Sequence, residues 1–242
     1  MVKLPADITE AVTQAQAATQ AALDAGYTRV QVELKIPELK IQPIAEQFIQ
    51  PFTPLGNQLR LLFPDAGSAA LARRDWGNPP YTLRGLNETP IKDTDALFIF
   101  IEPSSVEVEA VEQICNGASP RPVILLNPCL EDVAVVGIGY ASRQLRDRFL
   151  STLATCYYFQ PLDQAVLFHC YPHPWQLWQE EGDTYHCRAE FAQRPSGEEV
   201  ENLLYGVPDG AGESPGGEGS APSANKPGFL VGLQRFIKAL SQ

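Results

Sequence analysis

The sequence predicts an α/β fold, a three-layer sandwich built around a mostly parallel central sheet. Two short apolar runs, Ala96–Ile101 and Val123–Leu126, flank a helix-like stretch at Val106–Asn116. Each run is too short for a helix, is rich in β-branched or bulky residues, and is followed by an X-Pro pair. Strands without polar alternation are buried on both faces, as parallel strands usually are. We therefore expect a right-handed βαβ unit at the centre of the sheet.

The N-terminal part predicts a helix followed by a strand. Pro5–Ala25 has a modest apolar stripe, with Asp7 or Thr9 as its cap. Val30–Ile36 then alternates strictly between apolar and polar residues, which is typical of a strand with one face in water. We expect this strand to lie near an edge of the sheet.

Four segments lead up to the central unit. They read as a broken helix, a strand, a helix of small residues and a loop punctuated by Gly and Pro: Glu38–Pro54, Leu59–Phe63, Ala66–Arg74 and Trp76–Thr89.

After the central unit, a short strand at Val133–Ile138 and a long helix at Ser142–Tyr158 are expected. A strand and the two arms of an antiparallel hairpin follow at Ala165–Cys170, Trp175–Gln179 and Thr184–Phe191. Folding this hairpin about a four-residue turn would place Leu177 near His186. A capped helix at Ser196–Tyr205 completes the element list.

Composition divides the chain into one α/β domain (1–206), a disordered linker (207–228) and a tethered amphipathic helix (229–242). The linker is mostly Gly, Pro, Ser, Ala and Glu. The last segment has apolar residues at helical spacing together with basic ones, and its predicted contact residues are Phe229, Leu230, Leu233, Arg235, Phe236, Ile237, Lys238 and Leu240. Such a helix suits an anionic membrane surface or a partner's groove. The alternative is that it folds back onto its own acidic domain.

The totals exclude several classes of protein. A net charge of −11 argues against a nucleic-acid partner, because phosphate binding depends on clustered Lys and Arg. Five cysteines without a CxxC pair suggest reduced thiols in a cytosol-like compartment. No apolar run approaches the roughly 20 residues of a membrane span. The first residues match neither the signal-peptide pattern nor the transit-peptide pattern, so we expect a protein that is not exported.

The strand ends supply one candidate ligand site. Glu102 and Asn127 directly follow the two central strands, and the carboxyl ends of parallel strands are where open α/β sheets bind ligands. We expect Glu102, Asn127 and Asp132 to line a pocket there. The competing interpretation is that Glu-Pro and Asn-Pro only end the strands.

A second candidate is an anion site made by Gly137 and Gly139 before a helix that carries Arg143 and Arg146. Backbone N–H groups at a helix start and guanidinium groups one turn later suit a phosphate. The third glycine of GxGxxG is missing, however, and a plain strand-to-helix turn is the alternative.

No metal, cofactor or catalytic site is predicted. All three histidines and two cysteines fall within His169–Cys187, but the expected hairpin does not bring them together as zinc ligands. No nucleophile sits on a recognisable elbow.

Several stretches together resemble a known family: VQVELKIPEL, LLFPDAGSAALARRDWG, ILLNPCLED, RFLSTLATCYYFQPL and CYPHPWQLWQE. The resemblance covers roughly residues 5–205. It is to a cyanobacterial and chloroplast domain-of-unknown-function family that includes the plant low photosystem II accumulation protein and a domain fused to a chloroplast adenylate kinase. It implies a protein of oxygenic phototrophs that helps photosystem assembly by contact, and it brings no catalytic residues.

We therefore expect a non-enzymatic accessory factor in photosystem or thylakoid complex biogenesis. It would be cytoplasmic, peripheral on the cytoplasmic face of the thylakoid, and would present a surface without a deep pocket. The alternative hypothesis is a nucleotide- or phosphate-ligand-binding enzyme or sensor that uses the strand ends and the Gly137–Arg146 segment.

Overall fold

The computed structural model describes residues 3–88, 90–131, 140–182 and 184–206. The helices of this part are α1 (Ile8–Asp24), α2 (Ile41–Phe48), α3 (Ala66–Asp75), α4 (Val108–Ala118), α5 (Tyr140–Arg148) and α6 (Gly197–Tyr205), with 3-10 segments η1 (Gln50–Gln58), η2 (Ser105–Glu107) and η3 (Leu150–Thr152). The strands are β1 (Arg29–Leu34), β2 (Leu59–Phe63), β3 (Thr82–Gly85), β4 (Leu97–Ile101), β5 (Val123–Leu126), β6 (Ala154–Leu162), β7 (Ala165–Cys170), β8 (Trp175–Glu181) and β9 (Thr184–Phe191).

The described strands form one sheet in the order β3-β2-β4-β5-β1-β6-β7-β8-β9. From β3 to β6 neighbouring strands are parallel. From β6 to β9 they are antiparallel, because tight connections replace the crossover helices. The predicted mostly parallel sheet with a C-terminal antiparallel hairpin is confirmed.

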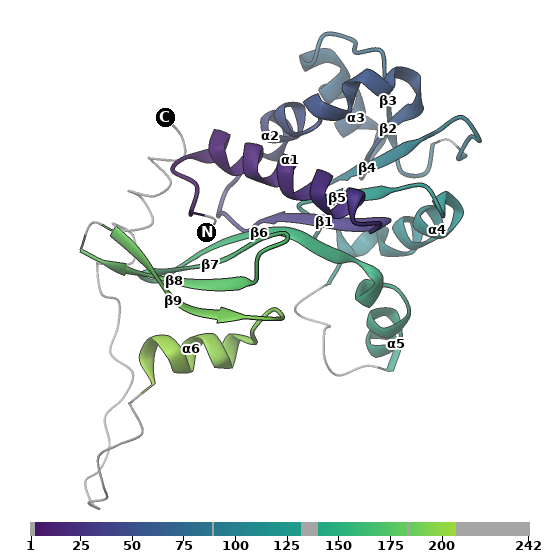
Figure 1. Cartoon of the computed structure of the whole chain (residues 1–242). Helices are drawn as coiled ribbons and strands as arrows, with labels where there is room; N and C mark the ends of the chain where they lie inside the picture. Colours follow the sequence, from purple (N-terminus) through teal and green to yellow (C-terminus); the bar gives the residue numbers. More distant parts are fainter. Residues whose placement is uncertain (1–2, 89, 132–139, 183, 207–242) are drawn as a thin grey trace, which may run out of the picture.

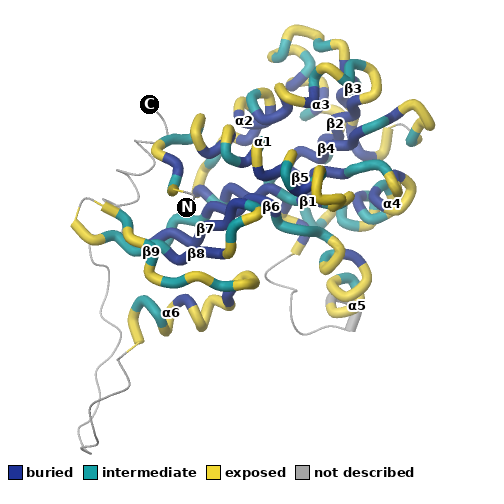
Figure 2. The backbone as a smooth tube through the Cα atoms, in the orientation of Figure 1, coloured by how far each residue is buried: buried dark blue, intermediate teal, exposed yellow. Residues whose placement is uncertain are grey.

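Helices cover both faces of the sheet, which gives the predicted three layers (Figure 1). On one face, here the α1 face, α1, α2 and α3 pack on alternate side chains of the strands in one large apolar core. On the opposite face, the α4 face, smaller cores lie under α4 with α5 and under α6. The buried strands run through the middle of the molecule between these layers (Figure 2).

Several predicted elements are confirmed with nearly the expected bounds. Asp7 caps α1 by accepting a hydrogen bond from the Glu10 N–H at 2.8 Å. Ser196 and Glu199 form a reciprocal capping box at α6. The broken helix, the helix of small residues, the central βαβ unit and the strands at Leu59–Phe63 and Ala165–Cys170 are also present.

The prediction for β1 is wrong in its position. β1 is not near an edge but lies between β5 and β6, at the centre of the sheet. Its alternation arises because Val30 and Val32 point into the α1-face core, while Gln31 and Glu33 point to the α4 face. Glu33 is buried rather than solvated.

Two further segments differ from expectation. The long helix predicted at Ser142–Tyr158 ends at Arg148, and β6 begins at Ala154, because the aromatic run that follows buries its side chains on both faces of the sheet. The expected loop Trp76–Thr89 contains the short edge strand β3. The predicted strand Val133–Ile138 lies entirely within 132–139, outside the described residues. The linker and the C-terminal helix, at 207–242, also lie outside them.

None of the helices in the described ranges combines the length and apolarity needed to cross a bilayer.

Candidate functional site

A groove of about 1030 Å³ opens on the α4 face of the sheet, over β1 and β6. We call it the β1 groove. Its described lining comes from β1, from the segment after β5, from α5 and η3, and from β8 and the segment after β9: Gln31, Glu33, Lys35, Pro128, Cys129, Leu130, Glu131, Arg146, Leu150, Ser151, Leu153, Thr155, Trp175, Ala192, Gln193 and Arg194.

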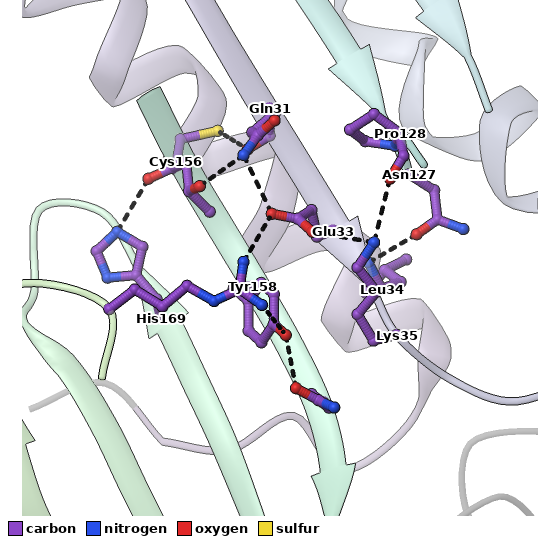
Figure 3. Close-up of polar contacts among 12 residues, drawn as sticks. Gln31, Glu33, Leu34, Lys35, Asn127, Pro128, Cys156, Tyr158 and His169 are labelled. Carbon is purple, nitrogen blue, oxygen red and sulfur yellow. Dashed lines mark hydrogen bonds and ion pairs between the residues drawn. The ribbon is translucent and has the colours of Figure 1, made fainter. Parts of the chain in front are cut away.

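Glu33 is the centre of the polar network in the β1 groove (Figure 3). One carboxylate oxygen lies 3.0 Å from the Lys35 Nζ. The other accepts a hydrogen bond from the Gln31 amide at 3.1 Å and lies 3.8 Å from a guanidinium nitrogen of Arg194. The side chain of Glu33 is only 7% exposed, whereas those of Lys35 and Arg194 are 32% and 48% exposed. The central carboxylate of the groove is therefore buried, whereas its two cationic partners are partly exposed to solvent.

A β-bulge in β6 shapes the floor of the groove. The register between β1 and β6 pairs Gln31 with Thr155 and then Val32 with Tyr157, so that Cys156 is the extra residue. Cys156 and Tyr157 both enter the α1-face core, while Thr155 and Tyr158 stay on the groove side. Thr155 accepts a hydrogen bond from the Gln31 amide at 2.9 Å, which ties the two strands together.

An aromatic stack supports Arg194. Its guanidinium lies 4.4 Å from the centre of the Tyr158 ring and 5.7 Å from that of Trp175, and it donates a hydrogen bond to the Tyr158 hydroxyl at 2.8 Å. Behind it, His169 stacks on Trp175 with ring centres 4.8 Å apart. These contacts hold the position of an arginine whose segment follows the last strand.

Burial sets the protonation of the groups behind this stack. Burial raises the pKa of Tyr158 to about 12, so its hydroxyl stays protonated and donates to the Gln160 side chain at 2.6 Å. Burial lowers the pKa of His169, although the carbonyls of Pro174 and Thr155 partly oppose this effect. The His169 ring is therefore neutral at pH 7.

The predicted strand-end residues Glu102 and Asn127 do lie together. Both adopt left-handed backbone conformations, with φ of 50° and 51°, and the Cys129 N–H donates to the Pro103 carbonyl at 2.8 Å. The Asn127 side chain accepts a hydrogen bond from the Leu34 N–H at 3.1 Å. Burial raises the pKa of Glu102, and a hydrogen bond with the Asn127 side chain lowers it part of the way back.

Glu102 and Asn127 nevertheless do not form the expected common pocket. Glu102 lines a smaller groove of about 470 Å³ between α2 and α3, together with Lys40 and Trp76. Asn127 joins β5 to β1, and the residue after it, Pro128, lines the β1 groove. The third member of the predicted set, Asp132, lies outside the described residues.

The predicted anion site is only partly described. Arg146 lines the β1 groove and pairs with Glu131 at 3.2 Å, and Arg143 is exposed on α5. Gly137 and Gly139 lie outside the described residues. So do the predicted contact residues of the tail, Phe229, Leu230, Leu233, Arg235, Phe236, Ile237, Lys238 and Leu240.

The sequence reasoning missed the main residues of the groove, Glu33, Lys35 and Arg194. The signal was present in the alternation of β1. Polar residues on a strand whose neighbours are continuous apolar runs fit either an edge strand or a central strand under an open groove, and β1 is the second kind.

The histidines and cysteines do not gather into a metal centre within the described ranges. The hairpin register pairs His186 with Gln179 and Leu177 with Ala189, so the expected proximity of Leu177 to His186 is wrong. Burial raises the pKa of Cys115 and of Cys156 to about 12 and that of Cys170 to about 11, so these thiols stay protonated.

Residues 5–202 match the family described as Domain of unknown function (DUF1995). The chain belongs to this family. The matched region contains every described lining residue of the β1 groove, so this part of the groove belongs to the DUF1995 domain. No solved structure matches the chain significantly.

Proposed function

We propose that the chain is a non-enzymatic accessory factor in the biogenesis of photosystem or other thylakoid complexes, acting by contact with a partner protein or an anionic membrane surface. The observation that carries the proposal is the β1 groove, in which an enclosed carboxylate holds two partly exposed cations in place. A fixed arrangement of paired charges suits recognition, because the donors are oriented before the partner arrives.

Two sequence features supply the context. The resemblance to the family of the low photosystem II accumulation protein supports a role in oxygenic phototrophs. The basic apolar pattern of 229–242 supports peripheral attachment on the cytoplasmic face of the thylakoid.

Deleting Phe229–Gln242 tests the attachment. We expect the truncated chain to move from the membrane to the soluble fraction of a cell lysate while its circular dichroism spectrum and melting temperature are retained. A matched control keeps the composition of 229–242 but scrambles its order, which removes the apolar stripe. Unchanged partitioning of both variants contradicts the attachment, and pull-downs from solubilised thylakoids with each variant test the protein partner.

The second candidate is a nucleotide- or phosphate-ligand-binding enzyme or sensor. The position of Arg146 on the wall of the β1 groove favours it. A thermal-shift series with ATP, ADP and inorganic phosphate should then raise the melting temperature. Replacing Arg143 and Arg146 with alanine should abolish the rise, whereas Arg74→Ala, an exposed arginine on α3, should retain it. A flat series contradicts this candidate.

A further inference from the structure

The β1 groove has a surplus of positive charge on an acidic chain. Its described lining contains three cationic side chains, Lys35, Arg146 and Arg194, and two carboxylates, Glu33 and Glu131. The surplus is one positive charge, whereas the whole chain carries −11. Electrostatics in the groove therefore favours a ligand with a single negative charge.

The two cations next to Glu33 line the groove and are held in place by neighbouring groups. Two of the three N–H donors of the Lys35 ammonium are occupied, by Glu33 at 3.0 Å and by the Pro128 carbonyl at 3.1 Å. Arg194 lines the same groove and is held by the Tyr158 ring and hydroxyl. Lys35 and Arg194 both contact Glu33, so one anionic group placed above Glu33 is within reach of both.

Three leucines contribute to the wall around the segment after β5 and η3, beside the polar Glu131 and Ser151. Leu130, Leu150 and Leu153 line it and pack onto the core under α4 and α5. The volume of the groove, about 1030 Å³, lies at the upper end of the range of small-molecule sites.

We propose that the β1 groove binds a small amphipathic monoanion, with its carboxylate on Lys35 and Arg194 and its apolar body against Leu130, Leu150 and Leu153. Glu33 is the positioning residue, because its largely buried carboxylate contacts both cations. This inference goes beyond the accessory role and does not depend on it. It also differs from the nucleotide candidate, since it uses Lys35 and Arg194 rather than Arg143 and Arg146.

Isothermal titration calorimetry of the full chain with sodium decanoate tests the proposal. Decanol is the neutral match of the same length, and inorganic phosphate is an anion without an apolar body. We expect decanoate to bind at least about tenfold more tightly than decanol, because one charge-assisted hydrogen bond contributes about that factor in affinity. Decanol binding as tightly as decanoate, phosphate binding as tightly, or no binding of decanoate overturns the proposal.

Variants locate the site. Lys35→Met should weaken decanoate binding about tenfold and Lys35→Arg should restore it. Arg74→Ala, on α3 far along the sheet from β1, is the matched loss of a cation and should change nothing. Circular dichroism and melting temperature confirm that each variant is folded. Unchanged decanoate affinity in folded Lys35→Met overturns the proposal. Unchanged membrane partitioning after deletion of 229–242 would contradict only the accessory role, so the two failures are distinguishable.

Discussion

Two charged clusters lie on the α4 face of the sheet, and they differ in their access to water. Near the amino ends of the strands, Arg60 and Asp95 form an ion pair at 3.3 Å in which both side chains are almost fully buried, at 2% and 3% exposure. In the β1 groove, Glu33 is equally enclosed, but its partners Lys35 and Arg194 are partly exposed. A sealed pair can only support the fold, whereas an open cluster has donors left for a ligand. The predictions below test this difference.

The largest effect is expected at the sealed pair. Asp95→Asn removes the charge that compensates a buried guanidinium, so we expect the free energy of unfolding to fall by about 3 kcal/mol. Urea unfolding measures it. Asp93→Asn, an exposed neighbour, is the matched control and should stay within about 0.5 kcal/mol of the parent. A loss below about 1 kcal/mol for Asp95→Asn would show that the pair is not sealed.

Asn127 is a hydrogen-bonded residue that directly follows β5 and directly precedes Pro128, a lining residue of the β1 groove. Its side chain is held by Leu34 and Glu102, and its backbone is in the left-handed region. Asn127→Ala should lower the free energy of unfolding by about 2 kcal/mol, since it loses the hydrogen bonds and keeps the strain. Asn127→Gly also loses the hydrogen bonds but relieves the backbone strain, so its free energy of unfolding should lie about 1 kcal/mol above that of Asn127→Ala. Equal losses for the two variants would exclude a contribution from strain.

The open cluster should be less sensitive to the loss of charge. Glu33→Gln should reduce the free energy of unfolding by only about 1 kcal/mol, because Lys35 and Arg194 can regain contact with water. The exposed Glu109→Gln on α4 serves as the control in the same urea series. If Glu33→Gln lowers the free energy of unfolding as much as Asp95→Asn does, the open cluster supports the fold in the same way as the sealed pair, and the proposed difference between them is wrong.

The smallest effect concerns pH and the aromatic stack behind the groove. Because burial lowers the pKa of His169, the unfolded chain takes up the proton first as the pH falls. Stability should be complete above about pH 6.5 and should decline below it, by at most about 1.4 kcal/mol per pH unit, until the pH passes the lowered pKa.

Melting temperatures between pH 7.5 and pH 5 measure this dependence. His169→Gln should flatten the profile relative to the parent, whereas His186→Gln, an exposed histidine on β9, should not. Parallel profiles for the parent and His169→Gln would show that His169 does not cause the pH dependence of stability.

The fold was largely accessible from the sequence because its strongest signals are local. Short apolar runs ended by X-Pro pairs define β4 and β5, and caps at Asp7 and Ser196 define two helix starts. The prediction failed where one pattern has two explanations. The stripe of Ser142–Tyr158 fits a helix, but strand pairing with β1 and β7 decides the conformation of its second half.

The candidate site was less accessible, for a topological reason. Glu102 and Asn127 were predicted to be neighbours because strand ends meet at one edge, and they are. Whether the polar residues of β1 meet water, a helix or a groove depends on strand order, which a single sequence does not contain. Arg194 and Glu33 are more than a hundred residues apart in the sequence, so their contact depends entirely on the fold.

The most direct test of the central claim, that the β1 groove is a binding site, is a crystal structure of the chain with decanoate. The account predicts the carboxylate within hydrogen-bond distance of the Lys35 Nζ and the Arg194 guanidinium, with the alkyl chain along Leu130, Leu150 and Leu153. Decanoate found elsewhere on the chain, or a β1 groove that holds only water at saturating decanoate, would contradict it.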